Sequence, residues 1–195
     1  MLELYFVFVA FRILECLSFV HRSGEIAVST PSAHQNLYEL AAQVGIGLRT
    51  RGRTLAIAES CTGGWIAKVA TDVAGSSTWF DRGFVTYSNA AKVDMLGVHE
   101  TTIAAHGAVS AEVVAEMVAG ALARSGADIA LAVSGIAGPE GGSPNKPVGT
   151  VYLAWALRGG PVYAEDRLFS GNRDAVRLQT VATALQGVLD VLAQQ

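Results

Sequence analysis

Residues 58–64 place a hydroxyl, a thiol and two adjacent glycines directly after a short apolar run. Such a change just before a helical pattern is typical of a strand-to-helix turn, which presents side chains at the carboxyl edge of a sheet. Amides of the first helical turn lack partners within the helix and can hold a phosphate or a developing oxyanion. Ser60 therefore lies where a nucleophile would be useful. Taken alone, the segment favours the simpler interpretation that Ser60 or Thr62 caps the helix.

Two further segments could meet this edge of the sheet. Tyr87 ends a predicted strand and Lys92 follows about one helical turn later, so both can point into one cleft. A serine without His and Asp partners needs another base, and a lysine can serve when burial lowers its pKa. A tyrosine hydroxyl between them could relay the proton. Singly, Lys92 is better interpreted as a solvated lysine and Tyr87 as a packed strand residue.

The glycine-rich loop that begins at Ser134 is the third segment. Glycine backbones permit close approach to a phosphate, although an ordinary surface loop is an equally good interpretation. Neither of the common nucleotide-binding glycine signatures is present in the chain. The four histidines lack the spacing of a metal-binding helix, and we expect His99 and His106 to flank a loop. The sequence therefore predicts no metal site.

The composition indicates one globular domain that binds a small molecule. The 195 residues are 51% hydrophobic, which suffices for a continuous core. A net charge of -3 with 16% charged residues gives no basic surface for nucleic acid. Cys16 and Cys61 lie in very different contexts, which argues against a disulfide framework and indicates a reducing, cytoplasmic location.

The first 31 residues differ in character from the rest. Residues 4–20 are mostly apolar, but Arg12 and Glu15 interrupt them, and the uninterrupted apolar run is too short for a comfortable membrane span. The segment also lacks the basic start and the small-residue cleavage site of a signal peptide. We interpret residues 1–31 as an N-terminal extension of undefined role and residues 32–195 as the domain, with no membrane partner.

Helical and strand patterns alternate along residues 32–195. The last two strands follow each other through a turn with two glycines and a proline, which predicts an antiparallel pair. The fold class is therefore a three-layer α/β/α sandwich with a mixed, mostly parallel sheet. The predicted strands are residues 55–58, 79–87, 128–133, 148–157 and 162–169, and the predicted helices are residues 37–48, 65–73, 88–96, 109–124 and 174–192.

Several motifs follow one another in a fixed order: residues 59–64, residues 83–89 with Lys92, residues 106–110, residues 134–139 and residues 146–151. Together, over about residues 35–193, they resemble the CinA C-terminal domain family, and the ordered set is far more specific than any single motif. The resemblance implies hydrolysis of nicotinamide mononucleotide to nicotinate mononucleotide and ammonia, in pyridine nucleotide salvage, without a metal or other cofactor. It also implies a serine, a tyrosine and a lysine as the catalytic set, which fall on Ser60, Tyr87 and Lys92.

On this hypothesis a neutral Lys92, linked through Tyr87, takes the Ser60 proton as Oγ attacks the carboxamide carbon. Backbone amides of residues 61–64 would stabilise the oxyanion. One departure from the family pattern is Asn172, where relatives more often carry an acidic residue before the arginine. The residues expected to bind the substrate are Cys61, Thr62, Gly63, Gly64, Asn89, Ser134, Gly135, Gly138, Gly149, Thr150 and Arg173.

Two alternatives stay open. The same cleft could hold a nucleotide without cleaving it, in a domain that acts through a protein partner in competence or the DNA-damage response. Cys61 could instead be the nucleophile, because a thiol at a helix N-terminus can have a lowered pKa. The sequence also leaves a homodimer open.

Overall fold

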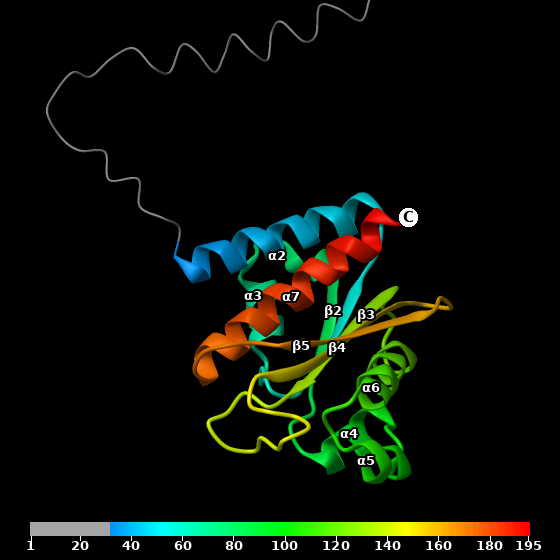
Figure 1. The fold of residues 1–195 in the computed structure, drawn as a ribbon. Coiled ribbons are helices and arrows are strands. Elements are labelled where there is room, and N and C mark those ends of the chain that lie inside the picture. The colour runs from blue at the N-terminus through cyan, green and yellow to red at the C-terminus, as the bar shows by residue number, and fades with distance from the viewer. Residues whose placement is uncertain (1–31) are drawn as a thin grey trace, which may run out of the picture. The chain divides into compact units, whose positions relative to one another are not determined.

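The computed structural model describes residues 32–195, so the predictions for residues 1–31 lie outside the described residues. A five-stranded sheet of order β2-β1-β3-β4-β5 forms the middle of the domain (Figure 1). β1 pairs in parallel with β2 and β3, whereas β4 is antiparallel to both β3 and β5. The predicted mixed α/β architecture is confirmed. The strands are β1 (Leu55–Glu59), β2 (Phe80–Val85), β3 (Ile129–Gly135), β4 (Thr150–Leu157) and β5 (Val162–Leu168).

Helices cover both faces of the sheet, and a short 3-10 helix, η1 (Ser76–Thr78), precedes β2 (Figure 1). Four helices begin with a side chain that caps the first turn: Ser32, Ser88, Ser110 and Asn172 each accept a backbone N–H. One face carries α2 (Ala33–Thr50), α3 (Trp65–Asp72) and α7 (Arg173–Ala193), and the other carries α4 (Asn89–Leu96), α5 (Glu100–His106) and α6 (Ala111–Ala123).

The two faces of the sheet differ in the size of their side chains. Toward α2, α3 and α7 the strands present large residues such as Ile57, Leu131 and Leu153. The alternate positions, such as Ala58 and Ala132, are mostly alanines and pack against the side of α6. Short side chains allow the helix layer of α4 and α6 to approach the sheet closely, which brings the first turn of α4 beneath the carboxyl end of β1.

A glycine fixes how α4 and α6 meet. A Cβ atom at Gly120 of α6 would overlap the backbone carbonyl group of Leu96, the last residue of α4. Only glycine permits this approach, so the position of α4, and of Lys92 on it, depends on a residue without a side chain.

Several predicted boundaries were wrong. β2 ends at Val85, so Tyr87 lies in the segment between β2 and α4 rather than at the end of a strand. Residues 100–106 form α5 rather than a loop, because Glu116 of α6 accepts the backbone N–H of His99 and the hydroxyl of Thr102 and so holds the first turn in place. β3 continues through Ser134 and Gly135, which pair with Tyr152 and Val151 of β4, so the glycine-rich loop starts later than expected. Within residues 32–195, no helix has the length and apolar character needed to cross a membrane.

Candidate active site

A cavity of about 220 Å³ opens where the predicted catalytic residues converge. It lies at the carboxyl ends of the parallel strands β1 and β3, the edge at which open α/β sheets bind ligands. Segments from the ends of β1, β2 and β3 and from the starts of α4 and α7 contribute to it. Its lining residues are Ser60, Cys61, Tyr87, Asn89, Lys92, Ala108, Val109, Ser134, Gly135, Ala137 and Arg173.

Lys92 contacts Ser60 directly. Its Nζ lies 2.9 Å from Ser60 Oγ and donates a second hydrogen bond, of 2.8 Å, to the carbonyl oxygen of Thr86. Ser60 follows the last residue of β1, and Lys92 lies in the first turn of α4, which begins just after β2. Because β1 and β2 are adjacent parallel strands, the segments that follow them lie side by side, and Ser60 and Lys92 come into contact.

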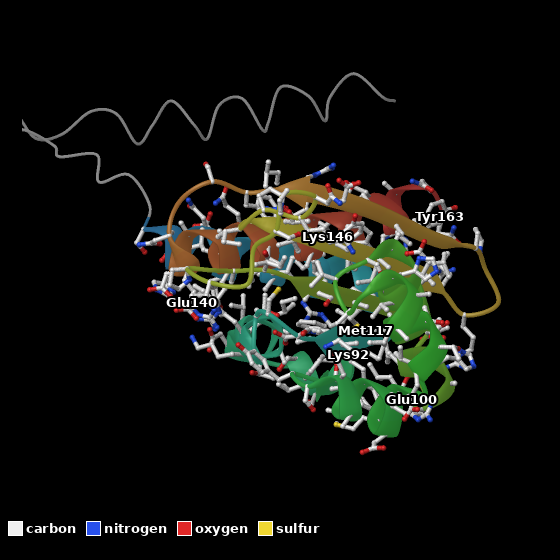
Figure 2. The ribbon with its side chains drawn as sticks, turned by 60° about the horizontal axis from the view of Figure 1, so that its bottom comes forward. Lys92, Glu100, Met117, Glu140, Lys146 and Tyr163 are labelled. Atoms are coloured by element: carbon white, nitrogen blue, oxygen red, sulfur yellow. The ribbon has the colours of Figure 1, made fainter. Side chains whose placement is uncertain are left out.

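The Lys92 ammonium group is almost completely enclosed, with 1% of the residue exposed. Figure 2 shows it inside the outline of the molecule, whereas Glu100 and Glu140 lie near the edge. Burial disfavours the charged form and lowers the pKa of Lys92 below its ordinary value of 10.5, against a smaller opposing effect of negative charge at Cys61. A larger fraction of neutral amine follows, and a neutral amine can accept a proton from Ser60.

Tyr87 makes its contact elsewhere. Its hydroxyl, on a side chain that is 61% exposed, accepts a 3.0 Å hydrogen bond from Nη2 of Arg173, whose Nη1 donates to the carbonyl oxygen of Gly138. Among residues 32–195 no hydrogen bond joins Tyr87 to Ser60 or Lys92, so the link expected through Tyr87 is replaced here by the direct contact. Asn172 caps α7 as an aspartate would, and Arg173 therefore starts the helix and lines the cavity.

Comparison with known proteins identifies the family. Residues 37–192 match the family described as the CinA C-terminal domain. The chain belongs to the CinA C-terminal domain family. The nicotinamide-nucleotide amidohydrolase PncC of Escherichia coli strain K12 is 60% identical over 150 residues, which are 77% of this chain and 91% of that protein. PncC of Pseudomonas putida is 57% identical over 152 residues, 78% of this chain and 94% of that protein.

Solved structures agree with this assignment. A CinA superfamily protein of Klebsiella pneumoniae superposes with a TM-score of 0.79 at 43% identity, over 83% of this chain and all of that chain (100%). A competence/damage inducible protein of Agrobacterium tumefaciens gives a TM-score of 0.78 at 48% identity, over 81% of this chain and 96% of that one. The fold described above is therefore that of CinA superfamily proteins.

The turn after β1 corrects two expectations for this CinA domain. Neither Ser60 nor Thr62 caps α3, because Gly64 occupies the N-cap position. Part of the oxyanion expectation is also wrong. The amide of Gly63 donates to the carbonyl oxygen of Ser60, and the amide of Gly64 donates to the carboxylate of Glu59. Neither glycine lines the cavity. Thr62 is fully buried and does not line the cavity, so its amide is enclosed. Within the described part of the chain, the amide of Cys61, which does line the cavity, makes no hydrogen bond to another residue.

Cys61 lines the cavity beside Ser60, but its thiol is not activated. Burial is the largest influence and raises its pKa from 9.0 to about 11. The expected lowering at a helix N-terminus is therefore wrong for this thiol, because the side chain is enclosed and the helix end is occupied by Glu59. Very little thiolate exists near neutral pH, which disfavours Cys61 as the nucleophile.

The remaining predicted binding residues divide into two groups. Asn89, Ser134 and Gly135 line the cavity, and the Ser134 hydroxyl donates to the carbonyl oxygen of Ala108, which fixes residues 107–110 against β3. The others lie behind the wall and support it. Those residues are Thr62, Gly138, Gly149 and Thr150: Thr62 is buried, Gly138 accepts from Arg173, the Gly149 amide donates to Ile136, and the Thr150 hydroxyl donates to Pro147.

Lys146 joins the glycine-rich loop to the opposite wall of the cavity. Its ammonium group donates to the carbonyl oxygens of His106 and Val109, at 2.8 and 2.6 Å. Two sequence motifs that lie some 40 residues apart in the chain thus meet through one side chain.

Sequence reasoning missed three features of the site. The carbonyl oxygen of Thr86 holds Lys92, and a backbone acceptor leaves no signal in residue type. Ala108 and Val109 line the cavity as ordinary apolar residues. Glu59 had a usable signal, namely an acidic residue at the end of a buried strand directly before a helix, where the helix dipole favours negative charge.

Proposed function

We propose that the chain hydrolyses the carboxamide of nicotinamide mononucleotide, with Ser60 as the nucleophile and Lys92 as its base. The observation that carries the proposal is the 2.9 Å contact between Lys92 Nζ and Ser60 Oγ inside the cavity. Relatives that are 55–60% identical are named nicotinamide-nucleotide amidohydrolases. The chain is an enzyme of this class, and pyridine nucleotide salvage in the cytoplasm is the role that we propose for it.

In the first step the neutral amine of Lys92 accepts the proton of Ser60 Oγ as that oxygen attacks the carboxamide carbon. The carbonyl oxygen becomes negatively charged, and the amide of Cys61 is our candidate for its hydrogen-bond donor. The tetrahedral intermediate then collapses. The C–N bond breaks, the Lys92 ammonium returns its proton to the leaving nitrogen, and ammonia departs from an ester on Ser60.

In the second step water attacks the ester carbon. Lys92, neutral again, takes one proton from the water, and the same amide stabilises the second oxyanion. Collapse breaks the bond to Ser60 Oγ, which regains its proton from Lys92. The acid leaves, and the site returns to its starting state without any additional reactant.

Arg173 is our candidate for recognition of the substrate phosphate. Replacing it with methionine should raise the KM for nicotinamide mononucleotide by about 10- to 100-fold, because a charge-assisted bond to phosphate is lost. Hydrolysis of nicotinamide riboside, which has no phosphate, should change far less. Steady-state ammonia release with both substrates checks this. Arg167→Met on β5, outside the cavity, is the matched control, and equal losses on both substrates would contradict the assignment.

Tyr87→Phe tests whether the Tyr87 hydroxyl transfers a proton in the reaction or only positions Arg173. The hydroxyl accepts from Arg173 and makes no bond to Ser60 within residues 32–195, so we expect its removal to loosen Arg173. The KM for nicotinamide mononucleotide should rise about 3- to 10-fold with kcat nearly unchanged, the pattern of a lost binding contact. Steady-state kinetics on the purified variant decide the matter. A fall in kcat of about 1,000-fold would instead restore Tyr87 to the proton path.

The substrate class itself is tested by ammonia release from nicotinamide mononucleotide, nicotinamide riboside and free nicotinamide. The proposal expects the mononucleotide to be hydrolysed with the highest kcat/KM. Binding of the mononucleotide without any ammonia release would favour the non-catalytic alternative.

A further inference from the structure

The turn that presents Ser60 has a backbone that needs external support. Gly63 and Gly64 both have positive φ, 62° and 94°, so the chain reverses sharply between β1 and α3. In this shape Ser60 contacts Lys92, and Cys61 lines the cavity beside it. Two charged side chains that take no part in the chemistry proposed above, Glu59 and Arg177, hold this turn from different sides.

Glu59 holds the side of the turn next to α3. It is fully buried, and its two carboxylate oxygens accept backbone N–H bonds from Gly64, Ile66 and Ala67 at 3.0, 3.1 and 2.8 Å. These donors are amides that a helix start leaves without internal partners, and a negative group is favoured at this end of the helix dipole. Glu59 thus ties the end of β1 to the first turn of α3, with Ser60 between them.

Arg177 holds the turn from α7. Its Nη2 donates a 2.8 Å bond to the carbonyl oxygen of Thr62, and its guanidinium lies 5.2 Å from the centroid of the Trp65 ring. The Nη1 atom lies 3.7 Å from the Asp174 carboxylate. Arg177 therefore fixes the orientation of the peptide group between Thr62 and Gly63.

We propose that Glu59 and Arg177 are positioning residues for the nucleophile turn. They fix Ser60 Oγ against Lys92 and hold the backbone of Cys61 at the cavity wall, and neither of them lines the cavity. This inference rests on the proposed function for the role of Ser60, but not on the identity of the substrate.

Glu59→Gln and Arg177→Met test the proposal. A glutamine at 59 keeps the shape, but its NH2 group must face a backbone N–H in either orientation, opposite Ala67 or opposite Gly64 and Ile66. A methionine at 177 keeps an apolar stem on Trp65 and removes the donor to Thr62. Misplacement of reacting groups by about 1 Å can cost about 100-fold, so kcat should fall about 10- to 100-fold with KM within about 3-fold.

The second readout is independent of the substrate. A small sulfonyl fluoride that modifies serine should react with Ser60, as followed by intact mass, and the two variants should slow this reaction in parallel with kcat. Glu116→Gln is the matched control, because its carboxylate also accepts a backbone N–H, from His99, but on the α5 side of α6. It should lower the thermal midpoint while leaving both rates within about 2-fold of wild type.

The outcomes separate the two proposals. Slower Ser60 modification in variants with native near-UV circular dichroism supports the positioning role, and unchanged rates in both folded variants overturn it. Should Glu59→Gln fail to fold, Arg177→Met alone decides. If wild type is sulfonylated at Ser60 but releases no ammonia, the substrate proposal fails while the sulfonylation rates still judge the positioning role. An unreactive Ser60 in wild type overturns both.

Discussion

Ser60→Ala will abolish ammonia release from nicotinamide mononucleotide, with kcat lower by about 10,000-fold or more. Alanine removes the oxygen that forms the covalent bond, and the amide of Cys61 can contribute only the residual stabilisation of a direct attack by water. Steady-state ammonia release, with enzyme in excess for the slow variant, measures the loss. The variant should still bind the mononucleotide, because the cavity walls and Arg173 are unchanged.

Cys61→Ala is the control for this result. It keeps the backbone amide and removes only a thiol whose pKa burial raises to about 11, so kcat should stay within about 10-fold of wild type. The opposite pattern, with Cys61→Ala inactive and Ser60→Ala active, would assign the nucleophile to the thiol. An inactive wild type that binds the mononucleotide would remove the serine mechanism altogether.

The position of Ser60 was predictable because strand-to-helix turns have a local signature. An apolar run of residues 55–58, small polar residues and two glycines report the geometry of the turn within about ten residues of chain. Ser32, Ser88 and Ser110 cap their helices through contacts of equally short range, since each side chain accepts the backbone N–H three residues later.

The direct contact between Lys92 and Ser60 was not predictable in this way. It depends on how deeply α4 sits under the sheet, which is set by the alanine face of β1 and β3 and by the absence of a side chain at Gly120. These are long-range packing effects, and a single alanine or glycine in a sequence does not report them. The sequence therefore predicted that Ser60 and Lys92 face one cavity but not that they are in direct contact, nor that the Tyr87 hydroxyl accepts from Arg173.

Lys92→Met should lower kcat about 1,000-fold or more, because Ser60 then has no base within hydrogen-bond distance among the described residues. Methionine is a buried residue type of similar length, so the cavity wall is kept. Steady-state ammonia release measures the effect. Lys68→Met is the matched control, since Lys68 lies on α3 and its exposed side chain pairs with Asp72 at the surface. Full activity of the Lys92 variant would leave the proposed mechanism without a base.

The pH dependence of wild type follows from the direction of the Lys92 pKa shift. Activity requires the neutral amine, so kcat/KM should fall as the pH falls through the lowered pKa, giving an acidic limb below the ordinary value of 10.5. Rates measured from pH 5 upward in buffers of constant ionic strength report it. Activity that instead rises toward low pH would show that Lys92 acts in its charged form.

The lowered pKa of Lys92 should also make the free energy of unfolding depend on pH. Because burial lowers the pKa of Lys92 in the folded state, the unfolded chain binds more protons between that pKa and 10.5. The contribution of this group to the free energy of unfolding therefore rises with pH across that window. Below the lowered pKa, Lys92 is charged in the folded state too, and the fold bears the full cost of burying the ammonium group. Lys92→Met should lack this slope in urea unfolding at a series of pH values, whereas Lys68→Met should retain it. If the free energy of unfolding of the Lys92 variant rises with pH as steeply as that of wild type, another buried group titrates in this window. The lowered pKa would then not belong to Lys92, the base proposed for Ser60.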